Sequence, residues 1–198
     1  VSSAENATVG GDKIEAWYDY YTFGGLPMII ERKTVEQKAN YLSNLFKETY
    51  IKDIVDRHNI DNPEEFEDII NILASAVGSL TNPTKVYNTI KSIRGTNTTI
   101  ARGTVNNYIE YLEDSFLIEK AQRFDVKGKK YIDTPYKFYF SDVGLRNARL
   151  NFRQQEENHI MENIIYNELL YRGYNVDVGV VETSIRDEFG KSKRVPLE

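Results

Sequence analysis

One predicted helix offers the side chains best suited to contact another molecule. Between residues 101 and 115, polar side chains share one helix face, at Arg102, Asn106, Asn107 and Glu110. Guanidinium and amide groups in the amino-terminal half of a helix can donate hydrogen bonds to base edges in the major groove of DNA. We therefore predict that Arg102, Asn106 and Asn107 are DNA-binding residues.

This helix is the second of a predicted pair. Asn82-Pro83 indicates the start of the first helix, because an asparagine side chain can cap free backbone amides and a proline ring is already set at a helical φ. We expect that helix to end near Gly95. In the second helix, apolar residues recur with a period of about 3.6, at Val105, Tyr108, Leu112 and Phe116. Their face is predicted to be buried.

A basic hairpin is predicted to follow the two helices. One strand begins at Phe116-Leu117-Ile118, and residues 137–140 form the returning strand. The turn between them contains three lysines that we expect to reach the phosphates of the DNA backbone, Lys127, Lys129 and Lys130. Two helices and a hairpin in this order are typical of a winged helix-turn-helix, with the hairpin as the wing.

The charge distribution supports a local contact with DNA. Residues 85–149 contain 12 Lys or Arg against 7 Asp or Glu, whereas residues 1–84 contain 7 against 14 and residues 150–198 contain 6 against 9. The formal net charge of the whole chain is −5. Because duplex DNA repels the acidic flanks, any contact would be confined to the middle of the chain. A winged helix can also be a packing or protein-interaction module, so that interpretation stays open.

Other groups of polar residues have less specific patterns. Glu48, Asp53 and Asp56 share one helix face, which we predict to be solvated and not a metal site. His58 and His159 are each isolated in a helical pattern, so we expect structural or surface roles.

The segment Gly190-Lys191-Ser192 has the last residues of a phosphate-binding loop. That motif requires a glycine five residues before its second glycine, and position 185 is Ile; Val195-Pro196 stands where its helix would follow. We therefore expect no triphosphate to bind there.

Composition indicates a soluble globular protein. The 198 residues are 40% hydrophobic and 12% aromatic, which is enough for one large domain or two small ones. No apolar run approaches the roughly 20 residues that span a bilayer, and no leader pattern precedes the first helix. The absence of cysteine fits a reducing compartment. We expect a cytoplasmic protein with no membrane partner.

The chain divides into four predicted regions. Residues 1–12 are expected to be a linker or boundary segment, 13–80 a helical region, 81–149 the winged helix-turn-helix, and 150–198 the start of an α/β domain. In the helical region, Thr34 and Gln37 form a capping box for a helix to about Arg57, and Asn62-Pro63 begins another. Gly24-Gly25 is expected to allow a left-handed turn. The last region is predicted to contain a helix over residues 155–171 and strands over residues 175–182 and from residue 195.

Four blocks in this order resemble one protein family. They are residues 17–27, 104–113, 138–145 and 162–174. Together they resemble the carboxyl-terminal half of uncharacterised AAA-type ATPases of archaea and bacteria, over about residues 14–198. The resemblance implies that a P-loop ATPase domain, with ATP and Mg²⁺ as its cofactors, precedes this region in the parent protein. None of its motifs is present here, so this chain is expected to need no cofactor and to have the missing ATPase domain as a partner.

The resemblance also implies a nuclease-like end. The winged helix would be followed by a small α/β domain similar to the PD-(D/E)XK nucleases, in which carboxylates hold Mg²⁺. Glu162 is then the candidate catalytic glutamate, with Glu168 second. Glu198 would open the strand that carries the remaining metal ligands, but the sequence ends there, so no complete metal site is expected.

The predicted fold class is mainly α: a helical region, then a winged helix-turn-helix, then the truncated start of an α/β domain. Two functions from different classes remain. In the first, the chain is the non-catalytic, double-stranded-DNA-binding or regulatory part of an ATPase. In the second, it is a protein-interaction module that packs on the ATPase core or on another protein, using the aromatic residues 17–23. A remnant of a Mg²⁺-dependent nuclease is the weakest alternative.

Overall fold

The computed structural model describes residues 2–95, 98–125, 128, 130–153, 156–179, 181–186 and 192–197, and these residues are mainly helical. The helices are α1 (Ser2–Phe23), α2 (Pro27–Ile30), α3 (Val35–Asn44), the π-helix η1 (Leu45–Ile51), α4 (Lys52–His58), α5 (Pro63–Ser75), α6 (Pro83–Arg94), α7 (Arg102–Asp114), α8 (Val143–Arg149) and α9 (Glu157–Tyr171). The strands are β1 (Ile118–Asp125), β2 (Lys130–Phe140), β3 (Val178–Gly179), β4 (Val181–Arg186) and β5 (Ser192–Leu197). Within these ranges no helix is both long enough and apolar enough to cross a bilayer.

Three predicted helix starts are confirmed. The Thr34 side chain accepts a hydrogen bond from the Gln37 amide, and the Gln37 side chain accepts one from the Thr34 amide, which completes the capping box of α3. Asn62 caps α5, and Asn82 caps α6, each by accepting from the amide three residues later. These caps satisfy amides that have no partner inside their own helix.

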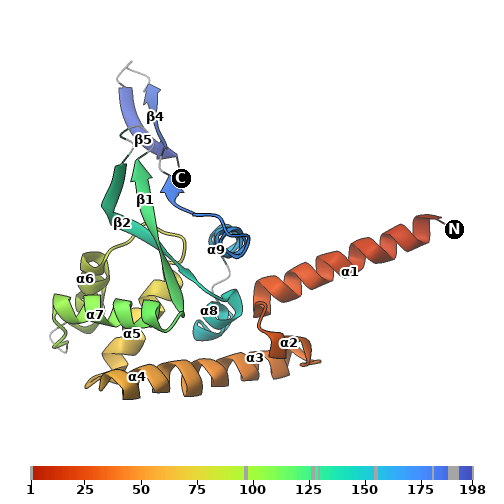
Figure 1. Cartoon of the computed structure of the whole chain (residues 1–198), viewed down its shortest axis with the longest axis horizontal. Helices are drawn as coiled ribbons and strands as arrows, with labels where there is room; N and C mark the ends of the chain where they lie inside the picture. Colours follow the sequence, from red (N-terminus) through yellow and green to blue (C-terminus); the bar gives the residue numbers. More distant parts are fainter. Residues whose placement is uncertain are drawn as a thin grey trace.

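The predicted long helix over residues 34–57 is a rod of three parts, α3, η1 and α4, along one edge of the molecule (Figure 1). Its buried side chains are Leu42, Phe46, Ile51 and Ile54. The five-residue step from Phe46 to Ile51 falls in the π-helical part. Because a π-helix has i to i+5 hydrogen bonds, this turn keeps both side chains on the core-facing side.

One prediction about local structure is wrong, and the amino-terminal segment is helical. Residues 2–12, expected to belong to a linker or boundary segment, are part of α1. A glycine inside a helix costs only about 1 kcal/mol, so Gly10-Gly11 weakens α1 without ending it. Phe116 was expected on the buried face of α7, but its side chain is 75% exposed. The helix ends at Asp114 and Phe116 has a φ of 56°, so the helical period does not extend to it.

A hairpin forms two of the three strands of the main sheet, with β1 in the centre. β1 and β2 pair antiparallel from Ile118 opposite Phe140 to Asp125 opposite Lys130, with an irregularity between Ala121 and Arg123. β3 pairs parallel with β1 on its other side, and β4 and β5 form a separate antiparallel pair (Figure 1). The strand predicted over residues 175–182 is therefore divided between β3 and β4. An isolated bridge joins Thr81, just before α6, to Tyr136 of β2.

The core lies between the helices α5, α6 and α7 and the hairpin. Its largest fully buried side chains include Phe66, Ile90, Leu112 and Phe138. A smaller cluster joins α1, α8 and α9 through Tyr21, Val143, Ile160 and Ile164. In Figure 1, α1 touches the remainder of the molecule at its carboxyl-terminal end and extends away from it toward the amino terminus. Thus α5, α6, α7 and the hairpin are held as one packed unit.

Candidate functional site

The face of α7 that was predicted to contact DNA is exposed. Val105, Tyr108 and Leu112 are buried on one side of the helix. The other side leaves four polar side chains open to solvent, Arg102, Asn106, Asn107 and Glu110. The apolar period of the sequence therefore correctly separated the buried face of α7 from its polar face.

These polar side chains have few partners within the protein. Among the described residues, Asn106, Asn107 and Glu110 form no side-chain hydrogen bond or ion pair. The Arg102 guanidinium lies 5.8 Å from the centre of the Tyr87 ring, a cation–π contact. Their donors and acceptors are consequently available to another molecule.

A polar pocket lies beside this face, between α7, the start of α6 and the hairpin. Its volume is about 320 Å³. Its walls include Asn82, Thr84, Arg102, Asn106, Glu110 and Tyr136. Glu113 and Lys120 also line the pocket, but they form an ion pair at 3.4 Å. Burial raises the pKa of Glu113, and the neighbouring Lys120 acts in the opposite direction.

The basic tip of the hairpin lies mostly outside the described residues. Lys127 and Lys129 are both outside them. Lys130 is the first residue of β2, and its backbone pairs with that of Asp125. The antiparallel hairpin itself is as predicted. The contact between these lysines and phosphates stays a prediction.

Glu162, the candidate catalytic residue, lies on α9 and is bonded to the hairpin. Its Oε1 atom accepts a hydrogen bond from Lys137 Nζ at 2.8 Å and from the Tyr139 hydroxyl at 2.5 Å. Lys137 and Tyr139 are two residues apart on β2, so their side chains lie on the same face of the sheet. Burial, followed by the hydrogen bond to Glu162, raises the pKa of Tyr139 well above its ordinary value, so the hydroxyl stays a donor.

These contacts make Glu162 part of a clamp between α9 and β2. A cavity of about 260 Å³ adjoins it, with Asp177 also on its wall. No group of three or more His, Asp or Glu side chains in the described ranges could hold a metal ion. Glu168 instead pairs at 2.6 Å with Arg172, which directly follows α9, and Glu198 lies outside those ranges.

Asp142 holds two of the family-like sequence blocks together. Its carboxylate accepts from the Gly25 amide at 2.8 Å and from the Leu145 amide at 3.1 Å, which caps α8. Burial raises the pKa of Asp142, and the backbone amides act against that rise. Gly24 has a φ of 75°, as expected for the left-handed turn, and a Cβ on it would overlap the Asp142 carboxylate. The sequence contained the cap signal of Asp142 but not its distant partner.

Amide side chains complete the connections around α8. Asn147 Nδ2 donates to the carbonyl oxygens of Tyr21 and Thr22 at the end of α1, each at 3.0 Å. Asn163 of α9 bonds both the amide and the carbonyl of Phe140, at 2.9 Å and 2.8 Å. The blocks over residues 17–27, 138–145 and 162–174 thus contain structural contacts between distant segments.

The remaining sequence candidates have structural or surface positions. The His58 ring stacks on the Tyr111 ring at 3.6 Å, and His159 lies 3.5 Å from Glu156. Both histidines are therefore engaged with neighbouring residues, as predicted. The carboxylate-bearing residues Glu48, Asp53 and Asp56 are all exposed, which agrees with a solvated face.

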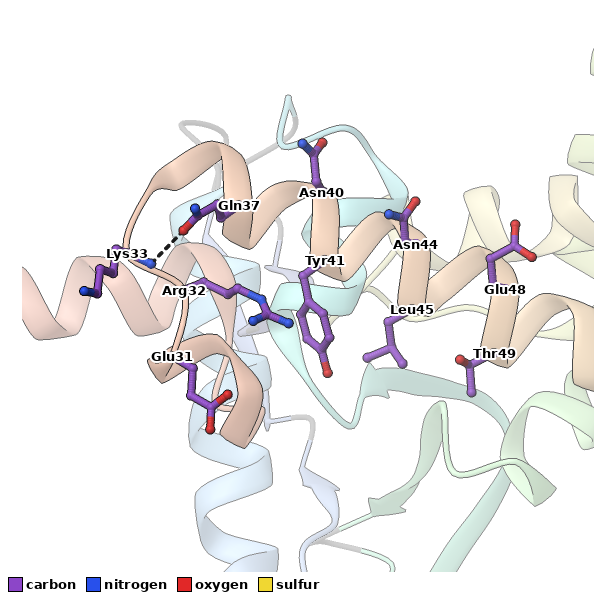
Figure 2. Close-up of a pocket in the computed structure, with 10 residues that line it drawn as sticks. All are labelled: Glu31, Arg32, Lys33, Gln37, Asn40, Tyr41, Asn44, Leu45, Glu48 and Thr49. Atoms are coloured by element: carbon purple, nitrogen blue, oxygen red, sulfur yellow. Dashed lines mark hydrogen bonds between the residues drawn. The ribbon is translucent and has the colours of Figure 1, made fainter.

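A wider pocket lies between residues 31–33, which follow α2, and the rod of α3 and η1, with a volume of about 830 Å³. Figure 2 shows the Arg32 side chain directed toward the Tyr41 ring. The central carbon of its guanidinium lies 5.0 Å from the centre of that ring. Gln37 Oε1 accepts from the Lys33 amide at 3.0 Å at its edge. Glu31 and Glu48 lie on its walls with Arg32 and Lys33, so both signs of charge are present. The formal charges of these four side chains therefore cancel.

The fold and the exposed face define a mainly helical domain with a polar surface on two adjacent helices. Residues 14–156 match the family described as Domain of unknown function (DUF8612). The chain belongs to this family.

Two relatives are longer than this chain. An uncharacterized protein of Haemophilus influenzae is 34% identical over 172 residues, which cover 87% of this chain and 42% of the relative. An uncharacterized protein of Methanocaldococcus jannaschii is 31% identical over 156 residues, which cover 79% of this chain and 34% of the relative. No solved structure matches significantly. The chain thus spans less than half of the length of either relative, and the AAA-type ATPase parent stays a prediction.

Proposed function

We propose that this chain is a non-catalytic part of a larger protein and binds double-stranded DNA through α6, α7 and the β1–β2 hairpin. One observation carries the proposal. In a chain of net charge −5, the 41 residues between Asp68 and Glu110 contain no carboxylate side chain. This stretch includes all of α6 and the first half of α7. The exposed side chains that this stretch contributes carry no negative charge, so they can approach phosphates that the acidic remainder of the chain repels.

The arrangement of elements supports the same proposal. The order α5, α6, α7 and hairpin, with the Thr81–Tyr136 bridge before α6, is the order of elements expected for a winged helix-turn-helix. In such modules the second helix of the pair lies in the major groove with its amino-terminal residues at the base edges. Arg102, Asn106 and Asn107 occupy that half of α7 and are exposed.

Titration of a labelled mixed-sequence duplex with the chain, followed by fluorescence anisotropy at two salt concentrations, tests the proposal. Lys85 and Lys91 are exposed basic residues of α6. At about 0.9 per neutralised phosphate, they contribute about −2 to the log-log salt slope. Lys85→Ala combined with Lys91→Ala should therefore reduce the magnitude of the slope by about 2, since each removes about one phosphate contact.

Lys47→Ala is the matched control, because Lys47 is equally exposed but lies on η1. It should leave the slope unchanged. Absence of duplex binding at low salt, or an equal effect of Lys47→Ala and the double variant, would refute the proposal.

A second candidate function is docking on a protein through α1. Ile14, Trp17 and Tyr18 are 60%, 39% and 62% exposed and lie on one stripe of the helix. Aromatic side chains of this kind are enriched in protein interfaces. Trp17 is the single tryptophan of the sequence, so its fluorescence reports on this stripe. A shift of its emission to shorter wavelength when the remainder of a full-length relative is added would favour docking.

We further infer, from the resemblance of the four sequence blocks, that the remainder of the parent protein contains the AAA-type ATPase domain with ATP and Mg²⁺. Hydrolysis of ATP by a full-length relative tests this inference. The nuclease-like interpretation of residues 150–198 has the same basis, together with the position of Glu162 on α9 before the strands β3 to β5. Cleavage of DNA by the full-length relative that is lost in the variant equivalent to Glu162→Gln would support it.

A further inference from the structure

We propose that α7 reads a DNA sequence, and that Glu110 selects a cytosine in it. This inference rests on the proposed function, since it requires α7 to lie in the major groove. Arg102, Asn106 and Glu110 are spaced by four residues, so they form one row along the exposed face of α7. All three line the pocket of about 320 Å³ beside α6 and the hairpin.

The three side chains differ in their hydrogen-bonding groups. An arginine guanidinium matches the O6 and N7 acceptors of guanine, an asparagine amide matches adenine, and a carboxylate accepts from the amino group of cytosine. A row of equivalent lysines would attract any phosphate, whereas this row presents a different chemical pattern at each turn of the helix. Such a pattern favours one base sequence over others.

The dimensions of the row fit a short stretch of duplex. At 1.5 Å per residue, the eight residue steps from Arg102 to Glu110 rise about 12 Å. With a rise of about 3.4 Å per base pair, this length corresponds to between three and four base-pair steps. The row can therefore contact three bases within one short site.

Glu110 is the decisive residue because its charge opposes DNA binding. It is the first carboxylate after the 41-residue stretch that has none. Within the described part of the chain it has no hydrogen-bonding or ion-pair partner, unlike Glu113, which pairs with Lys120. A carboxylate without a partner is repelled by phosphates unless a base supplies a donor to it. Glu110 thus weakens binding to sites that lack a cytosine in its reach.

Selection of preferred sites from duplexes with about ten randomised base pairs, one helical turn, tests this inference with the full chain. The wild-type chain should favour cytosine at one fixed position by about 5- to 150-fold, the range that corresponds to 1–3 kcal/mol per good base contact. Glu110→Ala should lose the preference at that position alone. It should bind unselected duplexes at least as tightly as the wild type, because a negative charge has been removed.

Glu48→Ala is the control, since Glu48 is an exposed carboxylate on η1. It should keep the cytosine preference. Duplex binding without any base preference, or a cytosine preference that persists in Glu110→Ala, would overturn this inference and leave the proposed function intact. Absence of all duplex binding would overturn both. Circular dichroism of each variant verifies that the fold is retained.

Discussion

The contact between Gly144 and the end of α1 leads to an unusual expectation for a helical glycine. Replacing a glycine by alanine inside a helix normally stabilises a protein by up to about 1 kcal/mol. A Cβ on Gly144, however, would lie far inside the contact distance of the Phe23 carbonyl oxygen and 2.9 Å from the Asp142 carboxylate. Phe23 is at the end of α1 and its carbonyl is backbone, so it cannot move aside as a flexible side chain would.

The magnitude follows from these two opposing effects. Forcing an extra carbon into a packed site costs about 1–3 kcal/mol and occasionally more. Displacement of the Asp142 carboxylate also weakens its hydrogen bonds to Gly25 and Leu145, which contribute about 1 kcal/mol each. After the gain in helix propensity is subtracted, Gly144→Ala should lower the free energy of unfolding by about 3 kcal/mol.

Gly103→Ala is the matched control. Gly103 also lies in the first turn of a helix, α7, and a Cβ on it would have no heavy atom within 4 Å. This variant should raise the free energy of unfolding by up to about 1 kcal/mol. Urea unfolding followed by circular dichroism measures both, with equal slopes against denaturant expected. If Gly144→Ala is as stable as the wild type, that result would contradict the close approach of Gly144 to the Phe23 carbonyl.

Further predictions concern the contacts around α8 and α9. Asn147→Ala removes two hydrogen bonds to the end of α1 and should destabilise the chain by about 2–4 kcal/mol in urea unfolding. Lys137→Met should cost about 2 kcal/mol, and Glu162→Gln should cost less in that background than in the wild type, because the ion pair is already broken and only the bond from Tyr139 is still weakened. Burial raises the pKa of Tyr166 from 10.0 to about 12. The unfolded chain therefore loses this proton first, and stability should be full below about pH 10 and fall by up to about 3 kcal/mol as the pH rises to about 12. Tyr166→Phe should reduce that alkaline decline.

Local signals in the sequence predicted the helices well. Thr34, Asn62 and Asn82 each cap an amide only three residues away, so a short window of sequence contains both partners. The exposed face of α7 was predictable for the same reason, since its apolar period is local. The prediction that Phe116 is buried was wrong because the apolar period was extended past the end of the helix.

Contacts between distant segments were not predictable in this way. The Asp142 carboxylate bonds an amide 117 residues earlier in the chain, and Asn147 bonds carbonyls 125 and 126 residues earlier. No pattern within either segment identifies the other. Asp142 was therefore not singled out in the sequence, and the bond between Lys137 and Glu162 likewise depends on the packing of α9 against β2.

The long sequence separation between α1 and the segment around α8 that binds its end also affects how the protein folds during synthesis. At about 5–20 residues per second, the ribosome needs roughly 6 to 23 s to add the 117 residues between Gly25 and Asp142. During that interval the segment that binds the end of α1 does not yet exist, so docking of α1 is a late event in the folding of each new molecule. Tyr21, which packs against Val143 of α8 and against α9 in the folded protein, stays open to chaperones and to other nascent chains until then.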